Sequence, residues 1–111
     1  MQKSYEVVWA NTAENDLFKI LEYIAENNPG NALNILKKIK KQVSELYFYP
    51  ERCRIVLELY NHGIAQYREM IISPWRVVYR VSESTVFVLS VLDSRQNIED
   101  ILLKRYTQHI I

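Results

Sequence analysis

The sequence predicts one α+β domain over residues 1–111, in the order β-α-α-β-β-β, with an antiparallel sheet, an N-terminal helical hairpin on one face and a C-terminal helix. Two observations predict this fold. The first half holds two stretches whose apolar residues recur with a helical period of about 3.6 residues. Residues 66–95 hold three short runs rich in β-branched and aromatic residues, separated by turn-forming residues. A chain of this length supports a single modest core.

The composition is that of a globular protein, with 49% apolar and 24% charged residues. The net charge is only +1, from 14 basic and 13 acidic residues, so bulk electrostatics gives no support to nucleic-acid binding. Cys53 is the only cysteine, which excludes an internal disulfide and favours a cytoplasmic location. No apolar run approaches the ~20 residues of a membrane span. We therefore expect no membrane association, and neither a metal nor a cofactor.

The first predicted strand covers residues 4–9, which are mostly β-branched and aromatic. A helix follows to about Asn27. Asn11 and Thr12 offer oxygens for its N-terminal cap, and Glu14 and Asp16 place carboxylates near its positive end. The apolar stripe of this helix is formed by Ala13, Leu17, Ile20, Leu21 and Ile24.

The second helix begins at Pro29, a residue suited to the first helical position, with Asn28 as its cap. Because almost no loop separates the two helices, they must form an antiparallel hairpin. Pro50 ends it. The apolar stripe of the second helix is formed by Ala32, Ile35, Leu36, Ile39, Val43 and Leu46.

Residues 50–65 are the least readable segment, with either one helical turn or a short strand expected there. Three strands follow, over residues 66–72, 75–81 and 85–93, and the short turns between them predict antiparallel pairing. The tail has apolar residues at helical spacing from Ile98 onward, and Asn97 is its expected cap.

Strand alternation predicts which arginines lie together. Arg76 and Arg80 share one face of the third strand, and Tyr79 lies on the opposite face. If the helical hairpin covers the face of Tyr79, the arginines, with Arg68 of the second strand, belong to the open face of the sheet. That open, basic, partly apolar face is the expected functional surface.

In the order and spacing of its segments the chain resembles the ParE/RelE toxin superfamily of bacterial type II toxin–antitoxin systems. No single segment is specific, and the resemblance depends on the order and spacing taken together with the pair YRE and WRVVY, which contains Arg68 and Arg76. The resemblance covers nearly the whole chain, through VVWANTAENDLFKILEYIAENNP, ALNILKKIKKQVSELYFYPER, QYREMIISPWRVVYRV and VFVLSVLDSRQNIEDILLKR.

The resemblance implies a small toxin that is neutralised by a partner antitoxin encoded beside it. RelE-like members enter the ribosomal A site and cleave mRNA, whereas ParE-like members inhibit DNA gyrase and poison replication. In a RelE-like reading Arg76 matches the third-strand arginine that contacts the scissile phosphate, assisted by Arg68 or Arg95. Such cleavage also needs an acid and a base, for which the sequence offers Glu58, His62, Asp93, Tyr106 and His109.

The ParE-like branch is the favoured interpretation, as a gyrase-binding toxin without chemistry of its own. None of the acid or base candidates lies at a position that matches the RelE-like members, and residues 55–67 contain no lysine. The near-neutral charge fits poorly with docking on ribosomal RNA. The alternatives are a RelE-like ribosome-dependent mRNA endonuclease and a non-toxic module that only binds the antitoxin. Asp93 departs from the histidine that many ParE-like chains carry there.

The expected partner-binding residues lie on or beside the meander, and each has a structural alternative. Arginines there also form salt bridges between strands, with Glu58, Glu69 or Asp93 as partners. Trp75 is either an exposed anchor for a partner or a packing residue at a strand edge. The lysines of residues 37–41 are expected on a solvated helix face. The expected partner-binding residues are Arg68, Trp75, Arg76, Arg80 and Arg95.

Overall fold

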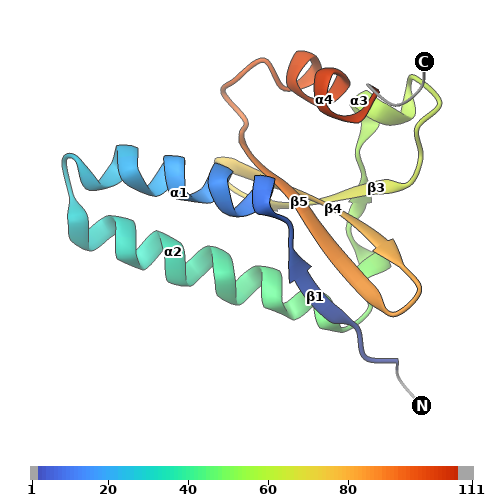
Figure 1. Cartoon of the computed structure of the whole chain (residues 1–111), viewed down its shortest axis with the longest axis horizontal. Coiled ribbons are helices and arrows are strands. Elements are labelled where there is room, and N and C mark those ends of the chain that lie inside the picture. The colour runs from blue at the N-terminus through green and yellow to red at the C-terminus, as the bar shows by residue number, and fades with distance from the viewer. Residues whose placement is uncertain (1–2, 108–111) are drawn as a thin grey trace.

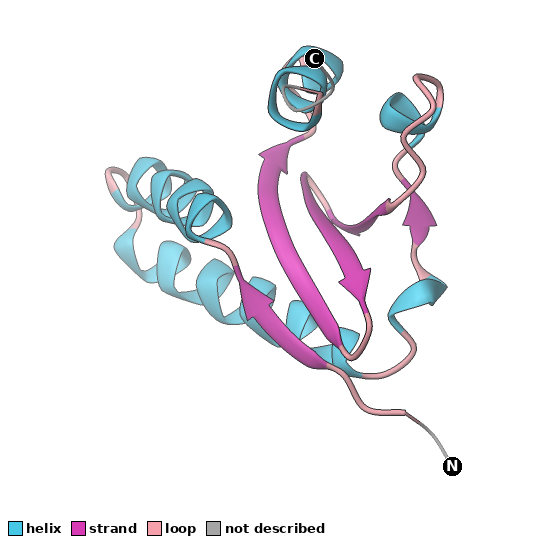
Figure 2. Ribbon diagram, turned by 45° about the vertical axis from the view of Figure 1, so that its right-hand side comes forward, coloured by secondary structure: helices cyan, strands magenta, loops and turns pink. Residues whose placement is uncertain are grey.

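We analysed a computed structural model, which describes residues 3–107. A five-stranded sheet forms its centre, and helices lie on both sides (Figures 1 and 2). The strands are β1 (Glu6–Trp9), β2 (Arg54–Ile55), β3 (Tyr67–Ile72), β4 (Trp75–Ser82) and β5 (Thr85–Asp93). The α-helices are α1 (Asn11–Ala25), α2 (Pro29–Ser44), α3 (Leu57–Tyr60) and α4 (Ile98–Tyr106), and the 3-10 helices are η1 (Glu45–Tyr47) and η2 (Pro50–Arg52).

The order of the strands across the sheet is β1-β5-β4-β3-β2. The predicted meander is confirmed, since β3, β4 and β5 pair antiparallel, and β2 extends them antiparallel at the β3 edge. The sheet as a whole is mixed, because β1 pairs parallel with β5. Strands joined by a short hairpin turn must pair antiparallel. β1 and β5 are instead separated by both helices and by the strands before β5, so they can pair parallel.

The predicted helical hairpin is confirmed, and α1 and α2 lie side by side along one face of the sheet (Figure 1). Asn28 caps α2 as expected, since its side chain accepts a hydrogen bond from the backbone N–H of Asn31. The apolar stripes of both helices pack against the β4 and β5 residues that point toward them, including Val77, Tyr79 and Val88. This main core buries Tyr79 completely, as the alternation of β4 predicted.

The opposite face of the sheet carries a second, smaller core beneath α3 and α4 (Figure 2). Val78 of β4 and Leu92 of β5 contribute to it from the sheet, and Ile98 and Leu102 contribute from α4. The expectation that this face is open is therefore wrong for the part near the end of β5. The prediction of a C-terminal helix is confirmed, and Asn97 caps it by accepting from the N–H of Asp100.

Residues 50–65, the segment that the sequence left open, contain both of the expected alternatives, a short strand and a helical turn. Pro50 begins η2, and its carbonyl accepts a hydrogen bond of 2.5 Å from the hydroxyl of Tyr79. β2 then pairs with β3, and α3 follows over the second core. Gly63 adopts a left-handed φ of 81° where the chain turns toward β3, a conformation that glycine accepts without strain.

No helix in the part of the chain that the structure describes is long and apolar enough to cross a membrane.

Candidate functional site

The arginines that were expected to form one surface lie on opposite faces of the sheet. Arg68 pairs in register with Tyr79, whose side chain faces the helical hairpin, and its guanidinium donates to the carbonyl of Cys53 at 2.6 Å. Arg76 pairs with Ile71 and Leu92 on the other face. The predicted pair of Arg68 and Arg76 on a shared open face is therefore wrong. The strand register decides which face a side chain occupies, and Arg68 lies on the same face of β3 as the apolar Met70 and Ile72.

Arg76 is buried within a cluster of carboxylates. Its Nη1 and Nη2 atoms donate to the two oxygens of Glu58 at 2.8 and 2.7 Å, and its Nε donates to Glu69 at 2.7 Å. Glu69 is only 2% exposed and also accepts from Arg54. The bidentate bond from Arg76 lowers the pKa of Glu58, and the two carboxylates raise the pKa of Arg76. The cluster ties α3 and β2 to the meander.

Of the other expected partner-binding residues, Trp75 is buried and Arg95 is paired with a carboxylate. Trp75 is 7% exposed and packs in the main core, so the packing alternative is the correct one. Arg95 is exposed, and its guanidinium donates to both carboxylate oxygens of Asp93, at 2.8 and 2.6 Å. This pairing lowers the pKa of Asp93. An exposed pair of this kind contributes little to stability, so Arg95 can exchange its partner at little cost.

Arg80 differs from the other arginines. Its guanidinium lies 5.2 Å from the ring centre of Phe87, in cation–π contact. Among the seven arginines of the described residues, it alone makes no hydrogen bond or ion pair with another protein group. The hydrogen-bonding groups of Arg80 therefore remain available.

An ion pair that the sequence did not predict joins α1 to α4. Arg105 of α4 donates to both carboxylate oxygens of Asp16 on α1, at 2.7 and 3.0 Å. Asp16 also accepts from the backbone N–H of Val91, and Ser90 contacts both Arg105 and Tyr106. Asp16 was interpreted as a carboxylate of the first helical turn. No sequence signal links it to a residue 89 positions away.

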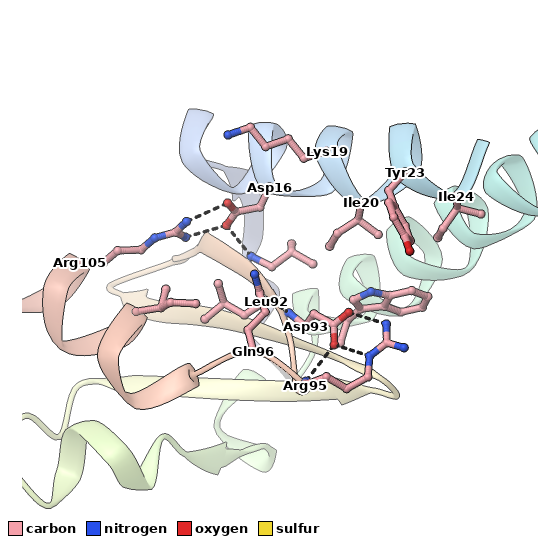
Figure 3. Close-up of a pocket in the computed structure, with 13 residues that line it drawn as sticks. Asp16, Lys19, Ile20, Tyr23, Ile24, Leu92, Asp93, Arg95, Gln96 and Arg105 are labelled. Carbon is pink, nitrogen blue, oxygen red and sulfur yellow. Dashed lines mark hydrogen bonds and ion pairs between the residues drawn. The ribbon is translucent and has the colours of Figure 1, made fainter. Parts of the chain in front are cut away.

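This ion pair lies at one end of a cleft between α1, the end of β5 and α4 (Figure 3). The cleft has a volume of about 440 Å³. Ile20 and Ile24 of α1 form an apolar wall beside Trp75, and Tyr23 is 71% exposed at the rim. The arginines of the rim, Arg95 and Arg105, both face their own carboxylate partners (Figure 3).

The described candidates for acid and base chemistry are each paired with another side chain. Glu58 and Asp93 have lowered pKa values because arginines pair with them, so neither holds a proton near neutral pH. Burial raises the pKa of Tyr106 to about 12, which keeps its hydroxyl protonated. His62 is exposed and lies 3.7 Å from Glu99. His109 falls outside the described residues.

Within residues 3–107, no group of three or more histidine, cysteine, aspartate or glutamate side chains is placed to hold a metal ion.

Comparisons with known proteins place the fold. The chain is similar to a solved structure of the chromosomal ParDE toxin–antitoxin system from P. aeruginosa, with a TM-score of 0.68 and 18% identity over 81% of this chain and 96% of that one. It is also similar to a chain of the RelBE2 toxin–antitoxin complex from Mycobacterium tuberculosis, with a TM-score of 0.57 and 20% identity over 84% of this chain and 94% of that one.

A search of curated protein sequences found no significant match. The family described as the ParE toxin of the type II toxin–antitoxin system parDE matches residues 7–98, which is most of the chain. The chain therefore belongs to the ParE toxin family of type II toxin–antitoxin systems.

Proposed function

We propose that this protein is a toxin that a cognate antitoxin neutralises, and that it acts by binding DNA gyrase without catalysing a reaction of its own. The family match and the likeness to chains from toxin–antitoxin complexes support the antitoxin partner. The choice between gyrase and mRNA depends on the chemistry that the arginines can perform.

The state of Arg76 carries the proposal. Cleavage of RNA through its 2′-hydroxyl requires a cation that stabilises the charge of the phosphorane. Arg76, the residue that a nuclease of this superfamily would use, has its Nε, Nη1 and Nη2 atoms engaged by Glu58 and Glu69. Separating a buried arginine from its carboxylates costs about 3–5 kcal/mol, so a phosphate would have to displace two strong acceptors.

The acid and base candidates support the same conclusion. Glu58, which pairs with Arg76 through both carboxylate oxygens, is held ionised by that arginine and is a weak base for the same reason. Tyr106 stays protonated, and its hydroxyl lies 2.5 Å from Ser90. The arrangement therefore favours a toxin that acts by binding, as proposed for the ParE-like branch.

Induced expression in a bacterial host without antitoxin tests the proposal. Growth, transcript integrity and the DNA-damage response are followed together. We expect growth arrest with DNA damage and intact transcripts, and inhibition of supercoiling when purified protein is added to DNA gyrase. Codon-phased cuts in mRNA that disappear in an Arg76→Ala variant would replace the proposal with a ribosome-dependent endonuclease. Normal growth would leave an antitoxin-binding module without toxicity.

A further inference from the structure

One end of the second sheet face extends beyond the core that α3 and α4 cover, and Tyr67 lies at the boundary, packed on Tyr106 of α4. The strand registers align Val8 of β1, Phe87 of β5, Arg80 of β4 and Tyr67 of β3 in one row across four strands. We call this row the Arg80 shelf. Val8 is 36% exposed, and Phe87 and Arg80 belong to neither core. The shelf therefore presents apolar surface on both sides of one guanidinium.

The guanidinium of Arg80 has hydrogen-bond donors that an anionic partner could accept. Arg80 lies in cation–π contact with Phe87, and its N–H groups have no protein acceptor in the described chain. A carboxylate accepts two parallel hydrogen bonds from such a fork. The neighbouring Tyr67 ring is itself fixed by the ring of Tyr106, at a centroid distance of 4.6 Å. Little side-chain ordering is then required when a partner binds.

The charges around the shelf favour a single carboxylate over a polyanion. Glu6 lies next to the row, on the same face of β1 as Val8, and Glu83 lies in the turn that joins β4 to β5, where its carbonyl accepts from the Nζ of Lys3 at 3.1 Å. These mixed charges form no continuous basic surface, whereas a chain of successive phosphates needs several unopposed cations. A peptide that brings one acidic side chain among apolar ones needs only one such cation, which Arg80 supplies.

A separate groove, lined by none of the four shelf residues, lies farther along β5. It is lined by Leu89, Ser90, Lys104 and Tyr106 among others, and its volume is about 520 Å³. Leu89 is two residues beyond Phe87, so a bound segment that crosses the shelf can extend toward Lys104. The shelf and the groove together offer room for several residues of a peptide.

We propose that the Arg80 shelf binds a segment of the antitoxin in which an acidic side chain pairs with Arg80 and adjacent apolar side chains pack on Val8, Phe87 and Tyr67. This inference rests on the proposed function, because it takes the antitoxin as the partner. It assigns the contact to Arg80, which the structure leaves available, rather than to Arg68 or Arg76.

Affinity measurements with the purified cognate antitoxin test the inference. Arg80→Glu is expected to weaken binding about ten-fold or more, and Phe87→Ala by a comparable factor, because both remove central contacts. Lys37→Glu is the matched control, since it makes the same charge reversal on an exposed position of α2 and is expected to change affinity less than about two-fold. Thermal unfolding of each variant confirms that it is folded.

A charge exchange makes the test specific. One acidic residue of the antitoxin, when changed to arginine, should restore binding to Arg80→Glu while weakening binding to the unchanged toxin. Folded Arg80→Glu that binds within about two-fold of the unchanged protein would overturn the inference and leave the proposed function standing. If the unchanged protein fails to bind the antitoxin, the proposed function itself fails. Arg80-dependent binding of a single-stranded oligonucleotide of about ten nucleotides, with antitoxin binding unaffected, would also overturn it.

Discussion

Arg76 and Arg80 lie four residues apart on one strand and point to the same face of the sheet, yet their surroundings differ completely. α3 and α4 cover the region of Arg76, which is 8% exposed and binds two carboxylates. Arg80 is half-buried, and its guanidinium lies in cation–π contact with Phe87 without a hydrogen-bond or ion-pair partner in the described chain. The same residue type therefore serves the fold at one end of β4 and remains available for a partner at the other.

The position of an arginine in a family pattern therefore does not fix its role. The partners of Arg76 come from α3 and β3, which are separate elements that the fold brings to it. Because Arg76 is buried, its guanidinium would be an unpaired buried charge without these carboxylates, which is energetically costly. Arg80 has no such partners and needs none, because solvent still reaches it.

The largest effect is expected from Glu69, which holds Arg76 and Arg54 together. Glu69→Ala leaves part of the Arg76 fork without an acceptor in a buried site, so the free energy of unfolding should fall by about 3–5 kcal/mol. Urea denaturation measures this change. Glu14→Ala, which breaks the exposed pair with Lys40, should cost no more than about 1 kcal/mol. Equal losses of unfolding free energy in the two variants would show that the carboxylate cluster around Arg76 does not stabilise the fold more than an exposed ion pair.

A smaller loss is expected at the Asp16–Arg105 pair, which is partly exposed. Asp16→Asn keeps the shape of the side chain and removes its charge, so the free energy of unfolding should fall by about 1–3 kcal/mol. Hydrogen exchange should show α4 opening more readily, while the hairpin of α1 and α2 keeps its protection. Unchanged exchange in α4 would contradict the view that this pair fastens the C-terminal helix to the N-terminal one.

The pH dependence of stability gives a smaller effect at Glu58. Its pKa in the folded protein is lowered from the model-compound value of 4.5 because Arg76 donates to it. The carboxylate therefore stabilises the fold above pH 4.5, and this contribution is lost as the pH falls through the lower folded pKa. Urea unfolding of the unchanged protein and of Glu58→Gln at pH about 7 and about 3.5 should give a stability difference that narrows at the lower pH. A constant difference would mean that the charge of Glu58 contributes nothing.

The sequence predicted the elements well and the faces of the sheet poorly. Local signals were sufficient for the hairpin, where Asn28 and Pro29 set the start of α2, and for the three strands of the meander. The parallel pairing of β1 has no local signal, since it depends on how the chain returns to β5. The short α3 is too brief for a periodic pattern.

Two signals for the arginine positions were present in the sequence. Arg68 alternates in phase with the apolar Met70 and Ile72, which marks the face that becomes the main core. Arg76 lies in the continuous apolar run of β4, the pattern of a strand covered on both faces. The carboxylate partners of Arg76 come from another strand and from α3, so their identity required the tertiary structure.

The most direct test compares the same conservative change at both arginines. Arg76→Lys and Arg80→Lys keep the charge and remove the planar fork that binds two acceptors at once. The free energy of unfolding should fall by about 2 kcal/mol or more for Arg76→Lys, because Glu58 and Glu69 lose the fork that joins them. It should change by less than about 0.5 kcal/mol for Arg80→Lys. Equal losses of unfolding free energy, or a larger loss for Arg80→Lys, would contradict the claim that Arg76 stabilises the fold while Arg80 is available to a partner.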